Sequence, residues 1–240
     1  MQYNDQDKTK LIDYFIYPHD IIENEMNELM RAFDPCFIVL GLLVIFNNNI
    51  DKQSLTLYDQ KSTTEVRITT VLNDMLHDID YGYLISMEGI SDSLSHLRNI
   101  YTKETPLTYT CFNKSMFDML VEAVGRHFIP SILKHGNSGF IKKKYVEVPF
   151  STNGKRHTIK IESKYEEMYF KRIIEDLNKG FYREVFEIFQ MEHREYRMFF
   201  VSKFLEMEKP TLRQSSRTVE QCCTLHHSVD TMNFHAFCSK

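Results

Sequence analysis

The sequence contains no tryptophan and none of the short motifs that mark the common enzyme classes. A Walker loop, a GxSxG nucleophile elbow, an HExxH zinc helix and a GxGxxG nucleotide loop are all missing. The aromatic side chains are 18 Phe and 13 Tyr, so single-ring residues must build the core. We therefore expect no catalytic residue and no cofactor, and we leave open only an enzyme whose active site follows no motif.

Strong charge of either sign and long apolar runs are also missing. The net charge is −4 over 240 residues, which argues against a nucleic-acid partner. The first ten residues are polar and lack the apolar run of a signal peptide. The most apolar stretch, Cys36–Phe46, has 11 residues, whereas a membrane-spanning helix needs about 20. We expect a cytoplasmic protein with this stretch in its core, and leave peripheral attachment to membranes open.

Five cysteines form no evident disulfide framework, and without a secretory signal we expect reduced thiols. Several residues near the C-terminus are of the types that bind zinc: Cys222, Cys223, His226, His227, His235 and Cys238. Adjacent Cys-Cys and His-His pairs fit no common zinc-finger spacing, so we expect no metal site. Cys111 has no motif around it, and we expect a buried structural thiol.

Helical periodicity recurs along most of the chain and predicts an all-α fold. Pro18 precedes one predicted helix, over residues 20–33. Another amphipathic helix follows Ser115, its predicted cap, and bends at Pro130. The residues expected on the buried stripe of that second helix are Phe117, Leu120, Val121, Val124 and Phe128.

The clearest helix starts at Ser163. Glu166 stands three residues after Ser163, as in a capping box, and Gly180 ends the helix. Its predicted inner face is made of Tyr165, Met168, Tyr169, Ile173 and Leu177. The segment 185–204 carries two apolar stripes in different registers, which predicts two consecutive helices with a break near residues 192–195.

Two segments alternate in the manner of short strands. Residues 54–69 alternate weakly and are compatible with a hairpin. In the long connector after Gly136, residues 145–148 and 158–161 predict a small hairpin around Asn153-Gly154. The connector also carries a basic group with a weak expectation of binding acidic phospholipids: Lys142, Lys143, Lys144, Lys155 and Arg156.

With these helices placed, the end of the chain resembles an RGS domain (regulator of G-protein signalling). The family closes with Met-Glu, three variable residues, Tyr-Pro, one residue, Phe-Leu, one residue and Ser. Met191-Glu192, Tyr196-Arg197, Phe199-Phe200 and Ser202 fall at this spacing, with Arg and Phe in place of Pro and Leu. Upstream, Ile159-Lys160-Ile161-Glu162 stands where the family has V-N-(L/I)-D. The long connector is more similar to the divergent domains of A-kinase anchoring proteins and sorting nexins.

The resemblance implies a protein that grips the switch loops of a Gα subunit and holds Gα's own catalytic groups in place. The family's key Asn corresponds to Lys160, and a lysine cannot accept a hydrogen bond. This implies that GTPase-activating activity is weak or lost. The partner-binding residues implied are Ile159, Lys160, Ile161, Glu162, Ser202 and Lys203. The alternative is that Ile159 and Ile161 only anchor an extended segment before a helix.

The expected fold is therefore all-α: an RGS-like helical bundle with a small β-hairpin in a long connector. We expect an N-terminal helical extension over residues 1–67, the RGS-like domain over 68–209 and a flexible tail over 210–240. The expected function is a protein-interaction module in G-protein or membrane-trafficking signalling. Its partner would be a Gα subunit or another signalling protein, with an acidic membrane surface as a further possibility. The alternative is an unrelated α-helical adaptor or host-interaction protein.

Overall fold

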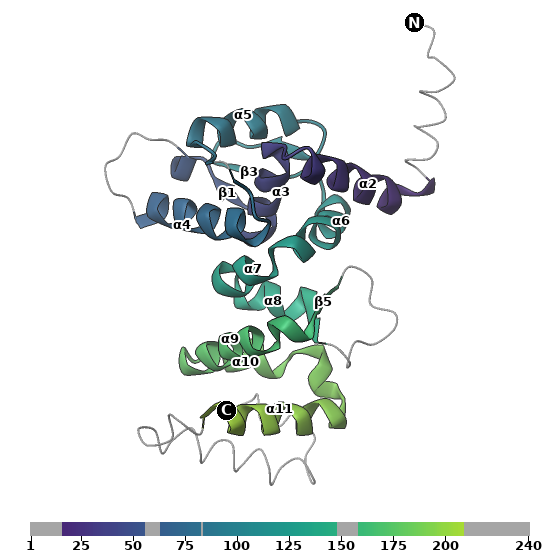
Figure 1. The fold of residues 1–240 in the computed structure, drawn as a ribbon, viewed down its shortest axis with the longest axis vertical. Helices are drawn as coiled ribbons and strands as arrows, with labels where there is room; N and C mark the ends of the chain where they lie inside the picture. The colour runs from purple at the N-terminus through teal and green to yellow at the C-terminus, as the bar shows by residue number, and fades with distance from the viewer. Residues whose placement is uncertain (1–15, 56–62, 83, 148–157, 209–240) are drawn as a thin grey trace, which may run out of the picture. The chain divides into compact units, whose positions relative to one another are not determined.

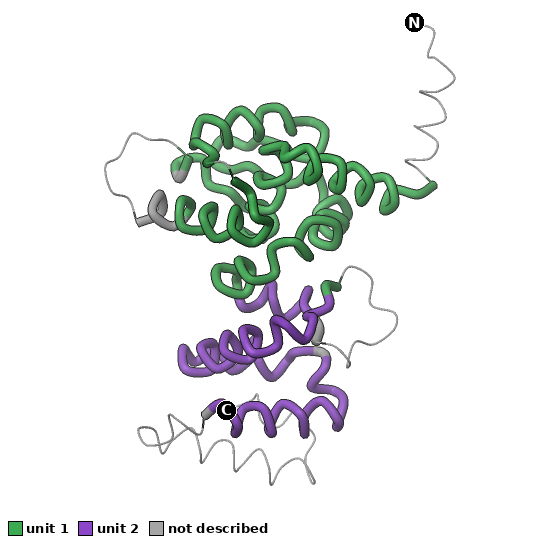
Figure 2. The backbone as a smooth tube through the Cα atoms, in the orientation of Figure 1, with its two compact units in different colours: residues 1–137, 156–159 green, residues 138–155, 160–240 purple. Residues whose placement is uncertain are grey.

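The structure is a computed structural model that describes residues 16–55, 63–82, 84–147 and 158–208 (Figure 1). Most of these residues are helical, which confirms the all-α class at that coarse level. The expected tail over residues 210–240, including its Cys and His residues, lies outside the described residues. The chain divides into two compact units, residues 1–137 with 156–159 and residues 138–155 with 160–240 (Figure 2).

Unit 1 combines helices with a small antiparallel sheet. Its elements are α2 (Pro18–Arg31), α3 (Pro35–Ile45), β1 (Ile50–Asp51), η1 (Gln53–Leu55), α4 (Thr63–Asp78), α5 (Met87–Leu97), β2 (Thr102–Glu104), β3 (Thr108–Cys111), α6 (Lys114–Gly125), η2 (Arg126–Phe128) and α7 (Ile129–His135). The predicted stripe of α6 and η2, from Phe117 to Phe128, is buried as expected. Its N-cap is Asn113 rather than Ser115, because the Asn113 side chain accepts from the Met116 N–H at 2.8 Å.

Helix α3 forms the centre of unit 1. Every residue from Cys36 to Ile45 is buried, and the helix contacts α2, α4, α5 and α6 (Figure 1). It begins at Pro35, after Asp34, whose carboxylate accepts from the Cys36 N–H at 2.8 Å. Although the segment is rich in β-branched residues, burial on all sides outweighs their weak helix propensity. The predicted core position of this stretch is confirmed.

The sheet of unit 1 has the strand order β1-β3-β2, and both pairings are antiparallel. Ile50 pairs with Tyr109, and Thr102 pairs with Cys111. The sequence patterns did not predict this sheet. The hairpin expected over residues 54–69 is wrong in its second half, because α4 begins at Thr63 and its buried side, including Ile68, packs into the helical core.

Unit 2 is built mainly from helices α8 to α11. Its elements are α8 (Ser138–Lys144), β4 (Tyr145–Glu147), β5 (Ile159–Ile161, of which Ile159 is counted with unit 1), η3 (Ser163–Tyr165), α9 (Glu166–Asn178), α10 (Tyr182–Phe186), η4 (Phe189–Glu192) and α11 (Arg194–Glu208). β4 and β5 form a two-stranded sheet, as predicted; the turn at Asn153-Gly154 lies outside the described residues. The predicted break near residues 192–195 is confirmed, because η4 ends at Glu192 and α11 starts at Arg194.

Helix α9 differs from its prediction in its start and its inner face. The chain enters through η3, and the N-cap of α9 is Tyr165 rather than Ser163, with no side-chain cap hydrogen bond. Gly180 ends the helix as predicted, in the left-handed region with φ of 83°. Met168, expected to face inward, is 42% exposed, whereas Phe170, which was not expected inside, is 1% exposed. The buried face is wider than one stripe because both α10 and α11 pack on α9.

The division into units differs from the expected boundary at residue 67. Helices α2 and α3, expected in an N-terminal extension, are integral to unit 1, since α3 supplies its most buried segment. The region expected as one RGS-like domain, residues 68–209, is shared between the two units. The physical reason is that α3 is apolar on all sides and must be covered by α4, α5 and α6.

Candidate interaction site

The strand β5 alternates between buried and exposed residues. Ile159 and Ile161 are 4% and 1% exposed, and Lys160 between them is exposed. Within β5 the two isoleucines therefore anchor the strand, and Lys160 presents its side chain to solvent. Successive side chains of a strand point to opposite faces, so Lys160 points away from the face that Ile159 and Ile161 bury. Glu162, the next residue of the predicted partner-binding segment, is also exposed.

Two ion pairs lie at the start of α9. Lys164 lies 3.0 Å from the Glu162 carboxylate and 4.8 Å from the Tyr165 ring centroid. The Glu162 carboxylate raises the pKa of Lys164. Glu166, the first residue of α9, pairs with Lys203 of α11 at 2.8 Å. We call Glu162, Lys164, Glu166 and Lys203 the charged face.

The Glu166–Lys203 pair brings two distant parts of the sequence together. Lys203 follows Ser202, an exposed residue of α11, and both belong to the predicted partner-binding set. Glu166 lies four positions after Glu162, another member of that set. The structure therefore places the start of α9 beside the middle of α11 in unit 2, although 37 positions of sequence separate the two paired residues.

An aromatic cluster holds α9 and α11 together. Tyr196, Phe200 and Phe204 of α11 are each at most 4% exposed. The Phe170 ring of α9 lies 5.9 Å from that of Phe200 and 5.8 Å from that of Phe199. Phe199 itself is only partly buried. Such ring pairs supply much of the packing energy between two helices.

Arg197 stands where the resembled family has proline. Its guanidinium donates to the carbonyl oxygens of Met191 at 2.8 Å and Glu192 at 3.1 Å. These two carbonyls close η4, so the Arg197 side chain fastens the start of α11 to the preceding turn. Arg197 and Lys164 were not among the residues expected to matter, because neither position has a residue-type signal of its own.

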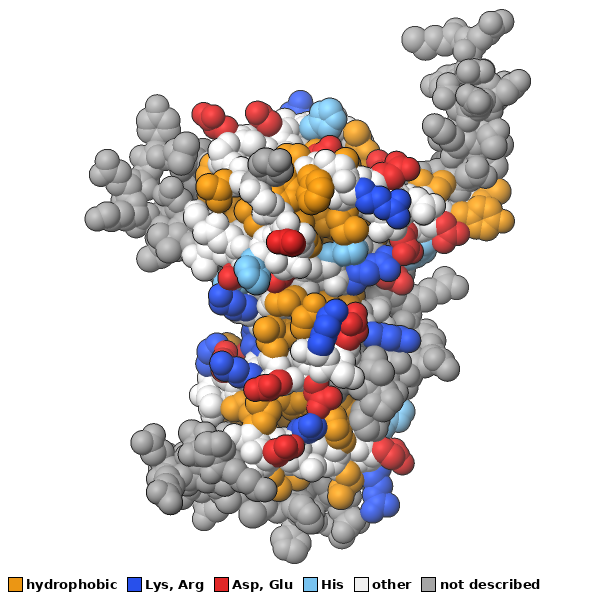
Figure 3. Space-filling view, in the orientation of Figure 1, with side chains coloured by type: hydrophobic (Ala, Val, Ile, Leu, Met, Phe, Trp, Pro, Cys, Tyr) orange, Lys and Arg blue, Asp and Glu red, His pale blue; other side chains and the backbone are white. Residues whose placement is uncertain are grey.

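Only some of the predicted phospholipid-binding residues are both described and exposed. Lys142 lies 2.6 Å from the Glu187 carboxylate, and its side chain is 16% exposed. The hydrogen bond from Lys142, followed by that from Arg183, lowers the pKa of Glu187. Lys143 is exposed and Lys144 is half-buried, whereas Lys155 and Arg156 lie outside the described residues. Figure 3 shows basic and acidic side chains interspersed over the face in view.

The described ranges contain two buried, unreactive thiols and no metal-binding group. Burial raises the pKa of Cys36 to about 11 and that of Cys111 to about 12, so both thiols stay protonated. Within the described ranges no group of three His, Cys, Asp or Glu side chains converges to hold a metal ion. None of the helices in the described part of the chain combines the length and hydropathy that a membrane span requires.

Comparison with known proteins identifies no protein similar to this chain. No protein-family model, no curated protein and no solved structure matches the chain.

Proposed function

We propose that the chain is an α-helical protein-interaction module of the RGS type, acting in G-protein or membrane-trafficking signalling. The observation that carries the proposal is the Glu166–Lys203 ion pair of 2.8 Å. The pair lies next to the two segments that carry the resemblance, because Glu166 follows residues 159–162 by four positions and Lys203 directly follows residues 191–202. A surface assembled from both segments is what a partner of this family would contact.

Lys160 is the reason to propose weak or lost GTPase activation. Its neighbours Ile159 and Ile161 are buried, so the backbone at Lys160 is fixed and the side chain extends into solvent. A partner loop approaching this strand meets a flexible cation with three donors and no acceptor. An asparagine there would offer both a donor and an acceptor without a charge.

The charged face supplies a second element of recognition. Its two ion pairs are partly or largely exposed, so each contributes little to folding stability. Exposed charges of alternating sign are better suited to selecting a partner and orienting its approach. We propose a Gα subunit, or another signalling protein with complementary charges, as that partner.

Binding to Gα subunits loaded with GDP and aluminium fluoride tests the proposal, together with single-turnover GTP hydrolysis. The wild type is expected to bind weakly and to leave hydrolysis near its intrinsic rate. Lys160→Asn is expected to give a partial gain in binding to the transition-state form. Lys171→Asn, which removes an exposed cation elsewhere on unit 2, is the matched control and should give no gain.

A second variant tests whether α11 belongs to the same surface. In the Lys160→Asn background, Lys203→Glu reverses the charge beside Glu166 and should remove the gain. Strong acceleration of hydrolysis by the wild type would overturn the proposed loss of activity. Failure of all variants to bind any Gα class would overturn the G-protein role.

One observation favours a different function, an unrelated helical adaptor or host-interaction protein. The sheet β1-β3-β2 joins Ile50 and Asp51, from the expected extension, to residues 102–111 of the expected RGS-like region. An all-helical signalling domain does not require such a sheet. The binding experiment separates the two functions, because an unrelated adaptor would not distinguish the aluminium fluoride state of Gα from the GDP state.

A further inference from the structure

A positively charged hollow lies in unit 1, where the end of α5 meets the sheet. Its lining includes three cations, Lys52, Arg98 and Lys103, and one carboxylate, Glu104, with Asn99 and Thr105 among its neutral residues. The hollow is open to solvent and has a volume of about 520 Å³. Small-molecule sites typically occupy about 300–1,000 Å³, so this space is large enough for a small ligand.

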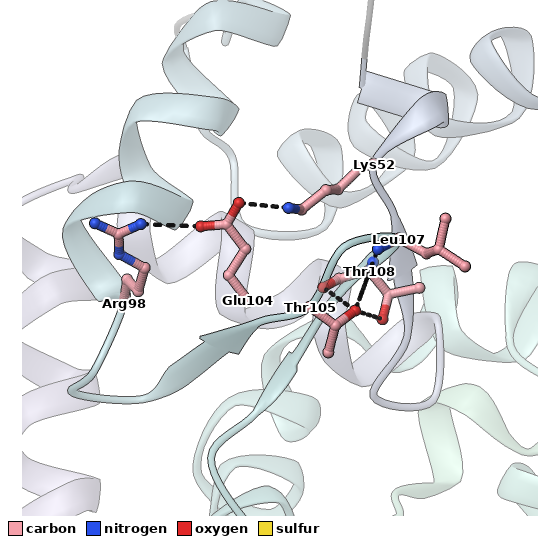
Figure 4. A network of polar contacts seen from close by, with 6 residues as sticks. All are labelled: Lys52, Arg98, Glu104, Thr105, Leu107 and Thr108. Carbon is pink, nitrogen blue, oxygen red and sulfur yellow. Dashed lines mark hydrogen bonds and ion pairs between the residues drawn. The ribbon is translucent and has the colours of Figure 1, made fainter.

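A single carboxylate is shared by two of the cations. Arg98 lies 3.0 Å from one oxygen of Glu104, and the Lys52 ammonium donates to the other (Figure 4). The hydrogen bond from Lys52, followed by that from Arg98, lowers the pKa of Glu104, so the carboxylate is ionised at neutral pH. Two positive charges therefore face one negative charge.

Lys103 adds a third positive charge that nothing in the described ranges neutralises. It is exposed on β2, and no residue of those ranges forms an ion pair with its ammonium. The residues lining the hollow thus carry two net positive charges. Like charges held together on a surface repel one another, and a bound anion relieves that repulsion.

The backbone around the hollow is held in place by hydrogen bonds. Lys103 and Glu104 lie on β2 and pair with Thr110 and Tyr109 of β3. The Lys52 N–H donates to the Leu107 carbonyl at 2.9 Å, which fastens the segment after β1 to the turn after β2. Cations carried on a fixed backbone need little reorganisation to meet a ligand.

The turn itself is stabilised by Thr105. Its hydroxyl oxygen accepts from the Thr108 N–H at 2.9 Å, which keeps the turn compact (Figure 4). The Leu107 side chain is 66% exposed and points away from the Glu104 carboxylate (Figure 4). The contacts that the hollow offers are therefore mainly polar, which favours a small ionic ligand over an apolar peptide.

We propose that this hollow binds a phosphate monoester, either on a soluble compound or on the headgroup of a lipid. A phosphate monoester carries about two negative charges at neutral pH, which matches the net charge of the lining. Arg98 supplies a planar guanidinium suited to phosphate oxygens, and Lys103 supplies a compact ammonium. Glu104 competes with the ligand for Lys52 and Arg98 and therefore limits its affinity. The site is independent of the function proposed above, since it involves only unit 1.

Two substitutions with opposite expected effects test the proposal. The probes are inositol trisphosphate, measured by calorimetry, and vesicles of phosphatidylcholine with or without phosphatidylinositol bisphosphate, measured by sedimentation. Lys103→Gln should weaken binding of the soluble probe about five-fold or more, since it removes an adjacent charge. Glu104→Gln should strengthen binding, because it releases Lys52 and Arg98 to the ligand.

Controls with the same changes in net charge are Lys171→Gln and Glu175→Gln, two exposed positions on α9. Both should alter the affinity less than about two-fold at 0.15 M salt, where exposed charges beyond about 8 Å are screened. Binding of the soluble probe without preference for the phosphoinositide vesicles identifies a soluble ligand. Binding only to those vesicles identifies the lipid headgroup.

Three results would overturn the proposal. The first is absence of wild-type binding to both probes at millimolar concentration. The second is a change in the α9 control variants as large as that in Lys103→Gln, which would mean attraction by net charge alone. The third is weaker binding in Glu104→Gln with an unchanged melting temperature. If Glu104→Gln does not fold, Lys103→Gln decides the question, since the Lys103 side chain forms no ion pair with another residue of the described ranges.

Discussion

Arg172 and Asp176 form an ion pair of 2.9 Å in the interior of unit 2, one turn apart on α9. Their side chains are only 10% and 7% exposed. Arg172 also donates to the Ser138 hydroxyl at 3.0 Å, at the first turn of α8. The pair therefore connects two helices and satisfies two buried charges at once.

Breaking the Arg172–Asp176 pair should lower the free energy of unfolding strongly. Arg172→Ala leaves Asp176 as an unpaired buried carboxylate, and we expect a loss of about 3–5 kcal/mol in the free energy of unfolding. The control is Arg183→Ala, which removes an exposed pair with Glu187 that has the same spacing along the helix and a length of 2.8 Å. It should cost much less than Arg172→Ala, because an exposed ion pair contributes little to stability. Urea denaturation of both variants checks the difference, and equal losses would contradict it.

The aromatic cluster predicts that alanine substitutions at adjacent residues lower the free energy of unfolding by different amounts. Phe200 is 4% exposed and contacts both Phe170 and Phe204, so Phe200→Ala should cost about 3–5 kcal/mol. Phe199, the preceding residue, is partly exposed, and Phe199→Ala should cost clearly less. Thermal unfolding of the two variants measures the order. The reverse order would mean that α11 is rotated relative to the structure.

Gly41 of α3 has no room for a side chain. A Cβ at this position would lie 2.6 Å from both the Met75 Cε and the Phe128 ring. The Met75 end can move, but the buried Phe128 ring has little freedom, so Gly41→Ala should destabilise the protein by about 1–3 kcal/mol. Gly82→Ala is the control, because nothing lies within 4 Å of its Cβ. Chemical denaturation should show little change, or a small gain, for the control.

The Asp74 carboxylate of α4 should make stability depend on acid pH. Burial raises the pKa of Asp74, but the hydrogen bonds from Lys134 and His135 outweigh burial, and the pKa lies below its usual value. The unfolded chain therefore binds the proton more tightly than the folded protein. The resulting contribution is fully present above the ordinary carboxyl pKa of about 3.9, and it is lost as the pH falls through the folded value.

Asp74→Asn lacks this contribution at every pH. The difference in unfolding free energy between wild type and Asp74→Asn should thus shrink as the pH falls from about 5 toward 2. Urea titrations at stepped pH measure it, with Asp92→Asn on an exposed face of α5 as the control for charge. A difference that grows on acidification would show that Asp74 is better stabilised when protonated.

Local patterns predicted some residues well and failed at others for physical reasons. The stripe from Phe117 to Phe128 was predictable because one face of α6 is buried and the helical period alone defines it. Met168 and Phe170 on α9 were misassigned because two helices contact α9 and the buried face is broader than one stripe. No local pattern specifies how many neighbours a helix will have.

The same distinction applies to the candidate sites. The exposure of Lys160 between two isoleucines follows from alternation and was implicit in the sequence. The pairing of Glu166 with Lys203 and the grouping of Lys52 with Arg98 depend on contacts between distant residues. Charged residues occur too often for their sequence positions alone to identify such pairs, so these features required the fold.

Helix α3 also has a consequence for how the protein is made. Among the helices that cover it, α6 ends about 80 residues after α3, so its synthesis is completed several seconds later at typical elongation rates. During that interval this apolar segment lacks part of its native cover and is a preferred target for chaperones. For the same reason, a fragment starting at residue 68 would expose the surfaces that α3 normally covers, and should be insoluble when expressed alone.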